Sequence, residues 1–234
     1  MSQMQSNRVS TTPTADEVRS MVEREVARST GPTGVVVGAG GDPLIVGLPI
    51  FAIGSLALGV ALIGKVTPLT ALGGIVPIVV FGTGLLLLVV TVWAAVLAQT
   101  MVAGITGTFS GFWLSLGALL VGLQHNWYGI APTQTATIAQ TQELFFIAWG
   151  ALFLFLLIPC LRLPAVYPLV VALVVAATAL AATFAHTGNT NLLTIAGYVV
   201  LTFAFLGFYA FINVALTATG AKRPMPPLGP AVLR

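Results

Sequence analysis

Six long apolar runs dominate the sequence, and short polar or proline-bearing segments separate them. A helix needs about 20 predominantly apolar residues to cross a bilayer. The runs predict an all-α membrane protein, a six-transmembrane-helix bundle whose spans cover about 43–64, 70–98, 103–122, 144–161, 165–185 and 192–218.

The composition excludes an ordinary water-soluble domain. Charged residues make up 6% of the chain and hydrophobic residues 57%, whereas soluble domains carry about 25% charged residues. The lipid bilayer is therefore the expected partner. The formal net charge is +3, but the basic residues lie at the chain ends and in one loop, without interleaved aromatics. They indicate topology rather than a nucleic-acid partner.

Three regions are predicted: 1–41, a cytoplasmic N-terminal region; 42–218, the transmembrane domain; and 219–234, a basic cytoplasmic tail. Thr14 and Glu17 fit a capping box. Apolar residues then recur at helical spacing, which predicts a short N-terminal amphipathic helix over about 15–28. A partly disordered tail is the alternative.

Positive charges give the orientation. With a cytoplasmic N-terminus only Lys65 lies outside, and the inner side receives Arg8, Arg19, Arg24, Arg28, Arg162, Lys222, Arg223 and Arg234. The positive-inside rule therefore predicts a multi-pass protein of the cell (plasma or inner) membrane with both termini cytoplasmic.

The predicted spans carry no ionisable group at mid-membrane. Between residues 44 and 221 the charged residues are Lys65, Glu143 and Arg162, each at a span end. Ion-coupled pumps usually need buried ionisable groups. A facilitative pore, or a carrier whose substrate brings its own proton, fits better.

An enzyme is not expected, and neither a metal nor a cofactor is predicted. The sequence shows no nucleophile–base pair and no phosphate-cradling loop. Cys160 is the only cysteine. His125 and His186 have no ligand partner at a recognisable spacing.

Two polar faces stand out within the spans. Thr106 and Ser110 share a face of the third span, and Tyr198, Thr202, Tyr209 and Asn213 share a face of the sixth. Such residues either form interhelical hydrogen bonds or line a solute path. The first span opens with Asp42 and Pro43, an N-cap aspartate followed by proline, which either only caps the helix or borders a solute vestibule.

Several motifs resemble those of the acetate uptake transporter family, the succinate–acetate permeases. Asp42-Pro43-Leu44-Ile45-Val46-Gly47-Leu48 is similar to the family signature Asn-Pro-Ala-Pro-Leu-Gly-Leu. Thr108-Phe109-Ser110-Gly111-Phe112-Trp113-Leu114 resembles its segment Ser-Tyr-Gly-Ser-Phe-Trp-Leu. Trp149-Gly150, Ala196-Gly197-Tyr198 and Pro227-Leu228-Gly229 have counterparts in the same order.

The resemblance implies a homo-hexamer in which each protomer has its own pore for small monocarboxylates. It also implies an apolar constriction that contains Phe51, Phe109 and an aliphatic residue of the fifth span, taken as Leu173. The chain departs from the family at Asp42, which replaces asparagine, and near Val214, where a family glutamate is absent. These departures bear on the substrate more than on the fold.

The leading hypothesis is passage of acetate or a similar short monocarboxylate. Phe51 and Phe109 would form an apolar gate, and Ser110, Tyr209 and Asn213 would offer hydrogen bonds. A channel for a small neutral solute such as urea is the alternative, favoured by Asp42. A third hypothesis is a membrane subunit that transports nothing and serves as a scaffold for a partner.

The orientation can be tested by cysteine labelling in a Cys160→Ser background. We expect Thr135→Cys to react with an impermeant thiol reagent added outside intact cells, and Arg162→Cys to react only after the cells are permeabilised. The opposite pattern would contradict both the orientation and the six-span count.

Overall fold

The computed structural model describes residues 14–21, 41–64, 74–221 and 227–233. Contacts divide the chain into two units, Met1–Gly41 and Asp42–Arg234. In the first unit, residues 15–21 are helical. The expected capping box is present, because Thr14 N–H donates to Glu17 Oε2 at 2.8 Å and Glu17 N–H donates to Thr14 Oγ1 at 3.3 Å. The rest of the helix expected over 15–28 lies outside the described residues.

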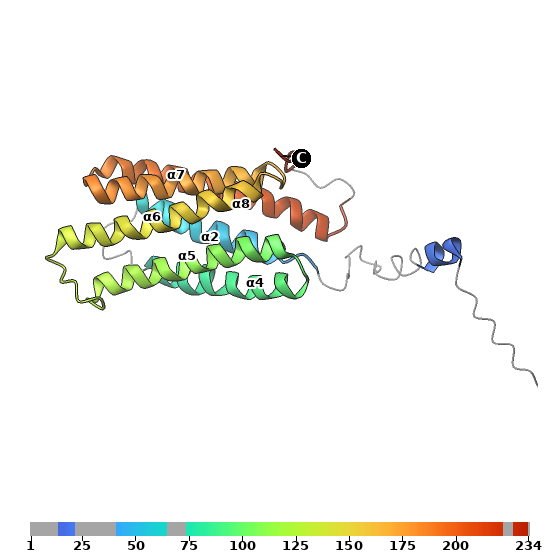
Figure 1. Cartoon of the computed structure of the whole chain (residues 1–234), viewed down its shortest axis with the longest axis horizontal. Helices are drawn as coiled ribbons and strands as arrows, with labels where there is room; N and C mark the ends of the chain where they lie inside the picture. The colour runs from blue at the N-terminus through green and yellow to red at the C-terminus, as the bar shows by residue number, and fades with distance from the viewer. Residues whose placement is uncertain (1–13, 22–40, 65–73, 222–226, 234) are drawn as a thin grey trace, which may run out of the picture. The chain divides into compact units, whose positions relative to one another are not determined.

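The second unit is built from long apolar helices, and its described part holds six that are long enough to cross a membrane. They lie side by side in Figure 1. The spans are α2 (Leu44–Leu62), a composite of α3 (Ile75–Pro77), η2 (Ile78–Leu85) and α4 (Leu86–Val96), then α5 (Thr100–Gln124), α6 (Thr135–Cys160), α7 (Val166–Thr187) and α8 (Thr190–Ala218).

Helix neighbours are not simply consecutive in the chain. The most extensive pairings are α2 with α8, α6 with α7, and α7 with α8, while α4 packs on α5. α6 is the least buried span, with 11% of its apolar stretch buried inside the chain. Its outward side carries large apolar side chains, including Leu144, Leu154, Phe155 and Ile158.

The second span contains a π-helical segment, η2, which the hydropathy pattern does not predict. Gly82 and Gly84, residues of low helix propensity, lie within it. Two side-chain hydrogen bonds tie it to its neighbours: Thr83 Oγ1 donates to Ile50 O at 3.3 Å, and Ser110 Oγ donates to Gly84 O at 2.8 Å. Both bonds anchor the backbone where the regular helical ladder is interrupted.

Glycines allow α2 to approach two partners closely. A Cβ on Gly54 would lie 2.9 Å from Thr83 Cβ, and a Cβ on Gly59 would lie 2.8 Å from Leu201 Cγ. On α8, a Cβ on Gly207 would lie 3.1 Å from Ala52 Cβ. In lipid no hydrophobic effect drives helix association, so this close van der Waals packing holds α2 centrally.

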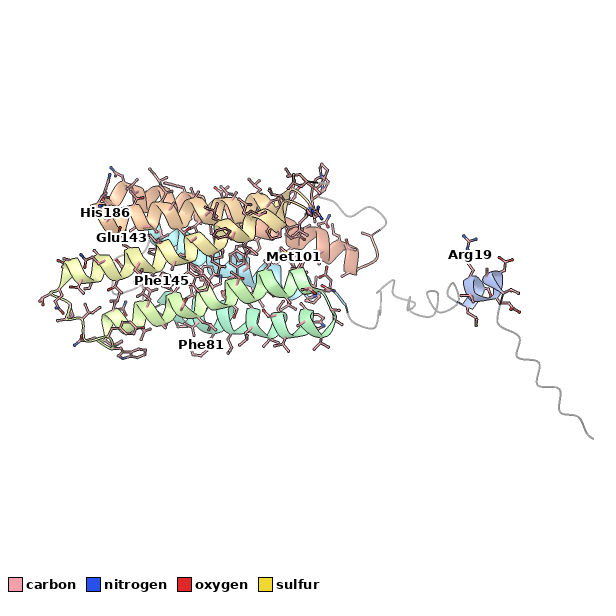
Figure 2. The ribbon with its side chains drawn as sticks, viewed as in Figure 1. Arg19, Phe81, Met101, Glu143, Phe145 and His186 are labelled. Atoms are coloured by element: carbon pink, nitrogen blue, oxygen red, sulfur yellow. The ribbon has the colours of Figure 1, made fainter. Side chains whose placement is uncertain are left out.

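Polar contacts fasten both ends of the bundle. At the end where α6 begins, His186 Nδ1 and Glu143 Oε1 are 3.1 Å apart, and Figure 2 shows the two residues together, far from Met101. At the other end the tail crosses the α6–α7 turn, where Leu233 N–H donates to Leu161 O at 2.9 Å and Val166 N–H to Leu228 O at 3.1 Å.

The six predicted spans and the all-α class are confirmed, with one notable boundary error. The spans expected at 103–122 and 144–161 leave a long polar connection between them, but α5 ends at Gln124 and α6 already begins at Thr135. Hydropathy locates only the stretch inside the hydrocarbon, whereas 26 residues at about 1.5 Å each extend roughly 39 Å, beyond a core about 30 Å thick. The polar first turns of α6 therefore continue the helix past the apolar layer.

Gly54 provides a test of the packing of α2. We expect Gly54→Ala to destabilise the bundle by about 1–3 kcal/mol, because the new methyl group meets the buried, β-branched Thr83. Gly104→Ala is the control, since a Cβ there has nothing within 4 Å. Thermal unfolding in detergent measures both. Equal midpoints for the two variants would contradict this account of the packing.

Candidate functional site

Two apolar cavities lie within the bundle, one beside each half of α2. The first cavity, of about 130 Å³, is lined among others by Leu44, Leu48, Met101, Thr106, Tyr167 and Ala210. The second cavity, of about 70 Å³, is lined among others by Leu58, Leu62, Trp113, Leu116, Val174 and Val200. A water molecule needs about 10–15 Å³, so each cavity has room for a solute of a few heavy atoms. None of the described residues that line them is charged.

Phe51 and Phe109 separate the two cavities and line both of them. Their ring centroids are 4.8 Å apart in an edge-to-face arrangement. Both side chains are buried, and both lie near the middle of their helices, α2 and α5. The two candidate gate residues are therefore in direct contact, at the place where the space inside the bundle is interrupted.

Further aromatic rings extend this pair into an aromatic row. Phe203 of α8 stacks on Phe51 at 5.7 Å, and Phe153 of α6 stacks on Phe109 at 5.1 Å. Each such pair adds about 0.5–1.5 kcal/mol beyond its buried area. The row formed by Phe203, Phe51, Phe109 and Phe153 thus links four helices at the level where the two cavities meet.

The hydroxyl groups of α5 are largely occupied by the protein itself. Thr106 lines the first cavity, but its Oγ1 donates to Val102 O at 2.8 Å and lies 3.0 Å from Thr91 Oγ1. Ser110 is buried and lines neither cavity, since it donates to Gly84 O. For these two residues the geometry favours the interhelical-bond interpretation, with Thr106 also exposing its surface to the cavity.

Three other predicted site residues lie outside both cavity linings. The Tyr209 hydroxyl donates to Pro227 O at 2.8 Å and so holds the tail, and Asn213 lies one turn further along α8. Leu173 packs against the core from a neighbouring face of α7. The remaining polar residues of the α8 face, Tyr198 and Thr202, are exposed on the outside of the chain.

The signature at the start of α2 borders the first cavity. Asp42 Oδ1 accepts a hydrogen bond from Leu44 N–H at 2.9 Å, and Pro43 is fully buried before the first turn. Gly47 and Leu48 line the cavity directly. A Cβ on Gly47 would lie 3.2 Å from Val90 Cγ1, so glycine keeps the second span close to this wall.

Sequence reasoning missed the α7 residues that line the space. Val171 lines the first cavity and Val174 lines the second. These two valines, one turn apart, occupy the position on α7 that was expected for Leu173. It also left Trp113 unassigned, although the residue belongs to the motif that supplied Phe109. Trp113 lines the second cavity with 1% of its surface exposed.

A model of a known protein family matches most of the chain. The family model described as the GPR1/FUN34/yaaH family matches residues 30–226. The chain belongs to this family. The match confirms the resemblance to the acetate uptake transporters that the motifs suggested. No curated protein matches the chain.

A solved structure has the same fold as this family member. It is the structure of the bacterial acetate channel SatP, which aligns with a TM-score of 0.70 at 21% identity, covering 81% of this chain and 99% of that one. At this identity the likeness establishes the six-span fold. In the described part of the chain, no three His, Cys, Asp or Glu residues are placed to hold a metal ion.

Truncating the aromatic pair tests whether it forms a gate. We expect Phe51→Ala and Phe109→Ala to raise the flux of a larger monocarboxylate about tenfold per assembled protein, equivalent to lowering the barrier by about 1.4 kcal/mol. The double variant should be non-additive because the rings touch. The measurement is uptake of acetate and of a larger monocarboxylate into proteoliposomes.

Phe205→Ala is the matched control, because this phenylalanine of α8 is 63% exposed. If the pair only packs the core, each truncation instead costs about 3–5 kcal/mol. Poorer assembly with unchanged size selectivity would remove Phe51 and Phe109 from the site.

Proposed function

We propose that this family member passes acetate or a similar short monocarboxylate across a membrane. The observation that carries the proposal is the pair of apolar cavities that meet at Phe51 and Phe109 inside a single bundle. Membership of the family and the fold shared with an acetate channel support the choice of substrate. The same observations favour a transport protein over an enzyme.

The apolar lining favours the neutral acid at the constriction. Moving an ion into an apolar interior costs several kcal/mol even after relaxation. Protonating a simple carboxylate with a pKa near 4.3 at pH 7 costs about 3.7 kcal/mol, at about 1.36 kcal/mol per pH unit. Since the second cost is comparable with or smaller than the first, passage as the acid is competitive, and flux should rise as the pH falls.

A channel for a neutral solute such as urea is the second candidate. No described residue in either lining carries a charge that would select an anion. Asp42, which stands where the family signature has asparagine, would also disfavour an anion near the start of α2. Competition between acetate and urea separates these two substrates.

The charge pattern and the exposed side of α6 bear on the orientation and the oligomeric state of the proposed pore. We propose a cell-membrane protein with regions 1–41 and 219–234 in the cytoplasm, as the positive-inside rule indicates. The outward apolar side of α6 is sparsely buried within one chain, which supports a homo-oligomer, with six copies as the number that the family resemblance implies. Native mass spectrometry counts the copies.

The transport proposal is tested with labelled acetate and proteoliposomes of the purified protein. We expect saturable uptake that increases as the pH falls and exceeds uptake by protein-free vesicles. Val171→Trp should reduce it at least tenfold, because the buried Val171 lines the first cavity beside α2. Leu169→Trp on the same helix is the control, since Leu169 is 49% exposed.

Assembly of both variants is checked by size-exclusion chromatography. If acetate uptake never exceeds that of protein-free vesicles while urea uptake does, the monocarboxylate proposal fails in favour of the second candidate. If neither solute enters the vesicles, the scaffold hypothesis replaces both transport proposals.

A further inference from the structure

One residue that lines the second cavity carries a buried hydrogen-bond donor that the protein does not use. Trp113 lines this cavity with 1% of its surface exposed. Within the described part of the chain, its Nε1–H has no hydrogen-bond partner. The indole N–H is a donor only, so it cannot be satisfied by accepting a hydrogen bond. Buried polar groups in native proteins are nearly always paired, and an exception calls for an explanation.

The other residues that line the second cavity do not supply a hydrogen-bond acceptor for the indole N–H. Thr178 is the other residue of this lining with a polar side chain. Its Oγ1 donates within its own helix, at 3.0 Å to Val174 O and 2.9 Å to Val175 O, and it forms no hydrogen bond with Trp113 Nε1. Phe112 packs edge-on against the Trp113 ring at 5.3 Å, which restrains the indole within the core. The donor is therefore fixed in place beside a cavity and lacks an acceptor.

The position of the donor relative to the aromatic pair is specific. Trp113 follows Phe109 by four residues on α5, one helical turn and roughly 6 Å further along the axis. Residues at this spacing share a helix face. A solute that leaves the aromatic pair on this side therefore reaches the Trp113 side chain within one turn. On the other side of the pair, the Thr106 hydroxyl in the first cavity already donates to Val102 O.

We propose that Trp113 Nε1–H donates a hydrogen bond to a carboxyl oxygen of a short monocarboxylate held in the second cavity. The proposal rests on the transport function above and adds a subsite to it. A cavity of about 70 Å³ limits the ligand to a few heavy atoms, and its apolar walls, such as Leu58, Leu116 and Val200, suit a short alkyl tail.

An uncharged donor also fits the demands of a pore. A lysine or arginine in an apolar cavity would hold a carboxylate tightly, whereas conduction requires binding that is weak enough for release. One neutral hydrogen bond orients the carboxyl group and partly replaces its lost water. Trp113 thus adds a preference for an acceptor-bearing solute to a path whose constriction is purely apolar.

The test replaces Trp113 by its benzothiophene isostere, which keeps the ring shape and lacks the N–H. We expect the half-saturation concentration for acetate uptake to rise about tenfold, the usual scale for one lost hydrogen bond, with assembly unchanged. Trp113→Phe is the genetically encoded counterpart. Trp149→Phe is the control, because Trp149 packs on Phe112 at 5.6 Å but lines neither cavity.

A second readout does not depend on transport. Ultraviolet resonance Raman spectra of the detergent-purified protein report hydrogen bonding of indole N–H groups. We expect sodium acetate to shift a tryptophan band that is absent in Trp113→Phe and retained in Trp149→Phe, and sodium chloride to leave it in place.

The two readouts separate the subsite from the transport function. Normal acetate uptake by the isostere with an unchanged half-saturation concentration would overturn the subsite and leave the transport function standing. An acetate-dependent band shift from Trp113 in a protein that does not transport acetate would support the subsite and overturn the function. Absence of both the shift and the uptake would overturn both.

Discussion

The need to pair every backbone N–H and C=O within the hydrocarbon layer determines the rest of this structure. It makes each span a helix, and it also governs the polar side chains. Hydroxyl groups bond back to carbonyls of their own helix, as Ser55 does to Phe51 O at 2.7 Å and Ser115 does to Gly111 O at 2.7 Å. Little hydrogen-bonding capacity is left for a solute, so an interior with hydroxyl residues in its walls still behaves as apolar. In such an interior one unpaired donor, Trp113, is conspicuous.

Small side chains set how closely the helices approach, and large side chains surround the space that remains. Glycines bring α2 against the second span and α8, as at Gly54 and Gly207, and leave no space at those contacts. Open space remains where bulkier residues meet, on either side of the aromatic row that joins α8, α2, α5 and α6. The two cavities and the ring contact between them are therefore products of one packing arrangement, and the glycine contacts fix the helix positions at which the rings can touch.

The sequence was sufficient for the spans because hydropathy registers the same lipid constraint that selects helices. Prediction of which side chains face the interior was weaker, because every face of these helices is largely apolar. On the sixth span, periodicity groups the polar residues on one face, yet it could not tell that Tyr198 is exposed while Tyr209 holds the tail. On α7 nothing distinguished Leu173 from Val171 and Val174. Phe51 and Phe109 became candidates through motifs. The hydrogen bonds that hold η2, from Thr83 to Ile50 O and from Ser110 to Gly84 O, join residues far apart in the chain, and no local pattern predicts them.

The aromatic row has a consequence for how the constriction is controlled. Phe109 is stacked on Phe153, and Phe153 belongs to α6, the span least buried within its own chain. The width at Phe51 and Phe109 therefore depends on where α6 sits, not on two side chains alone. In a single chain α6 is held mainly by α7 and by aromatic contacts with α5. If a second copy covers the outward side of α6, as the proposed oligomer requires, assembly itself would fix the last wall of the constriction. Pore geometry and oligomerisation would then be set by the same helix.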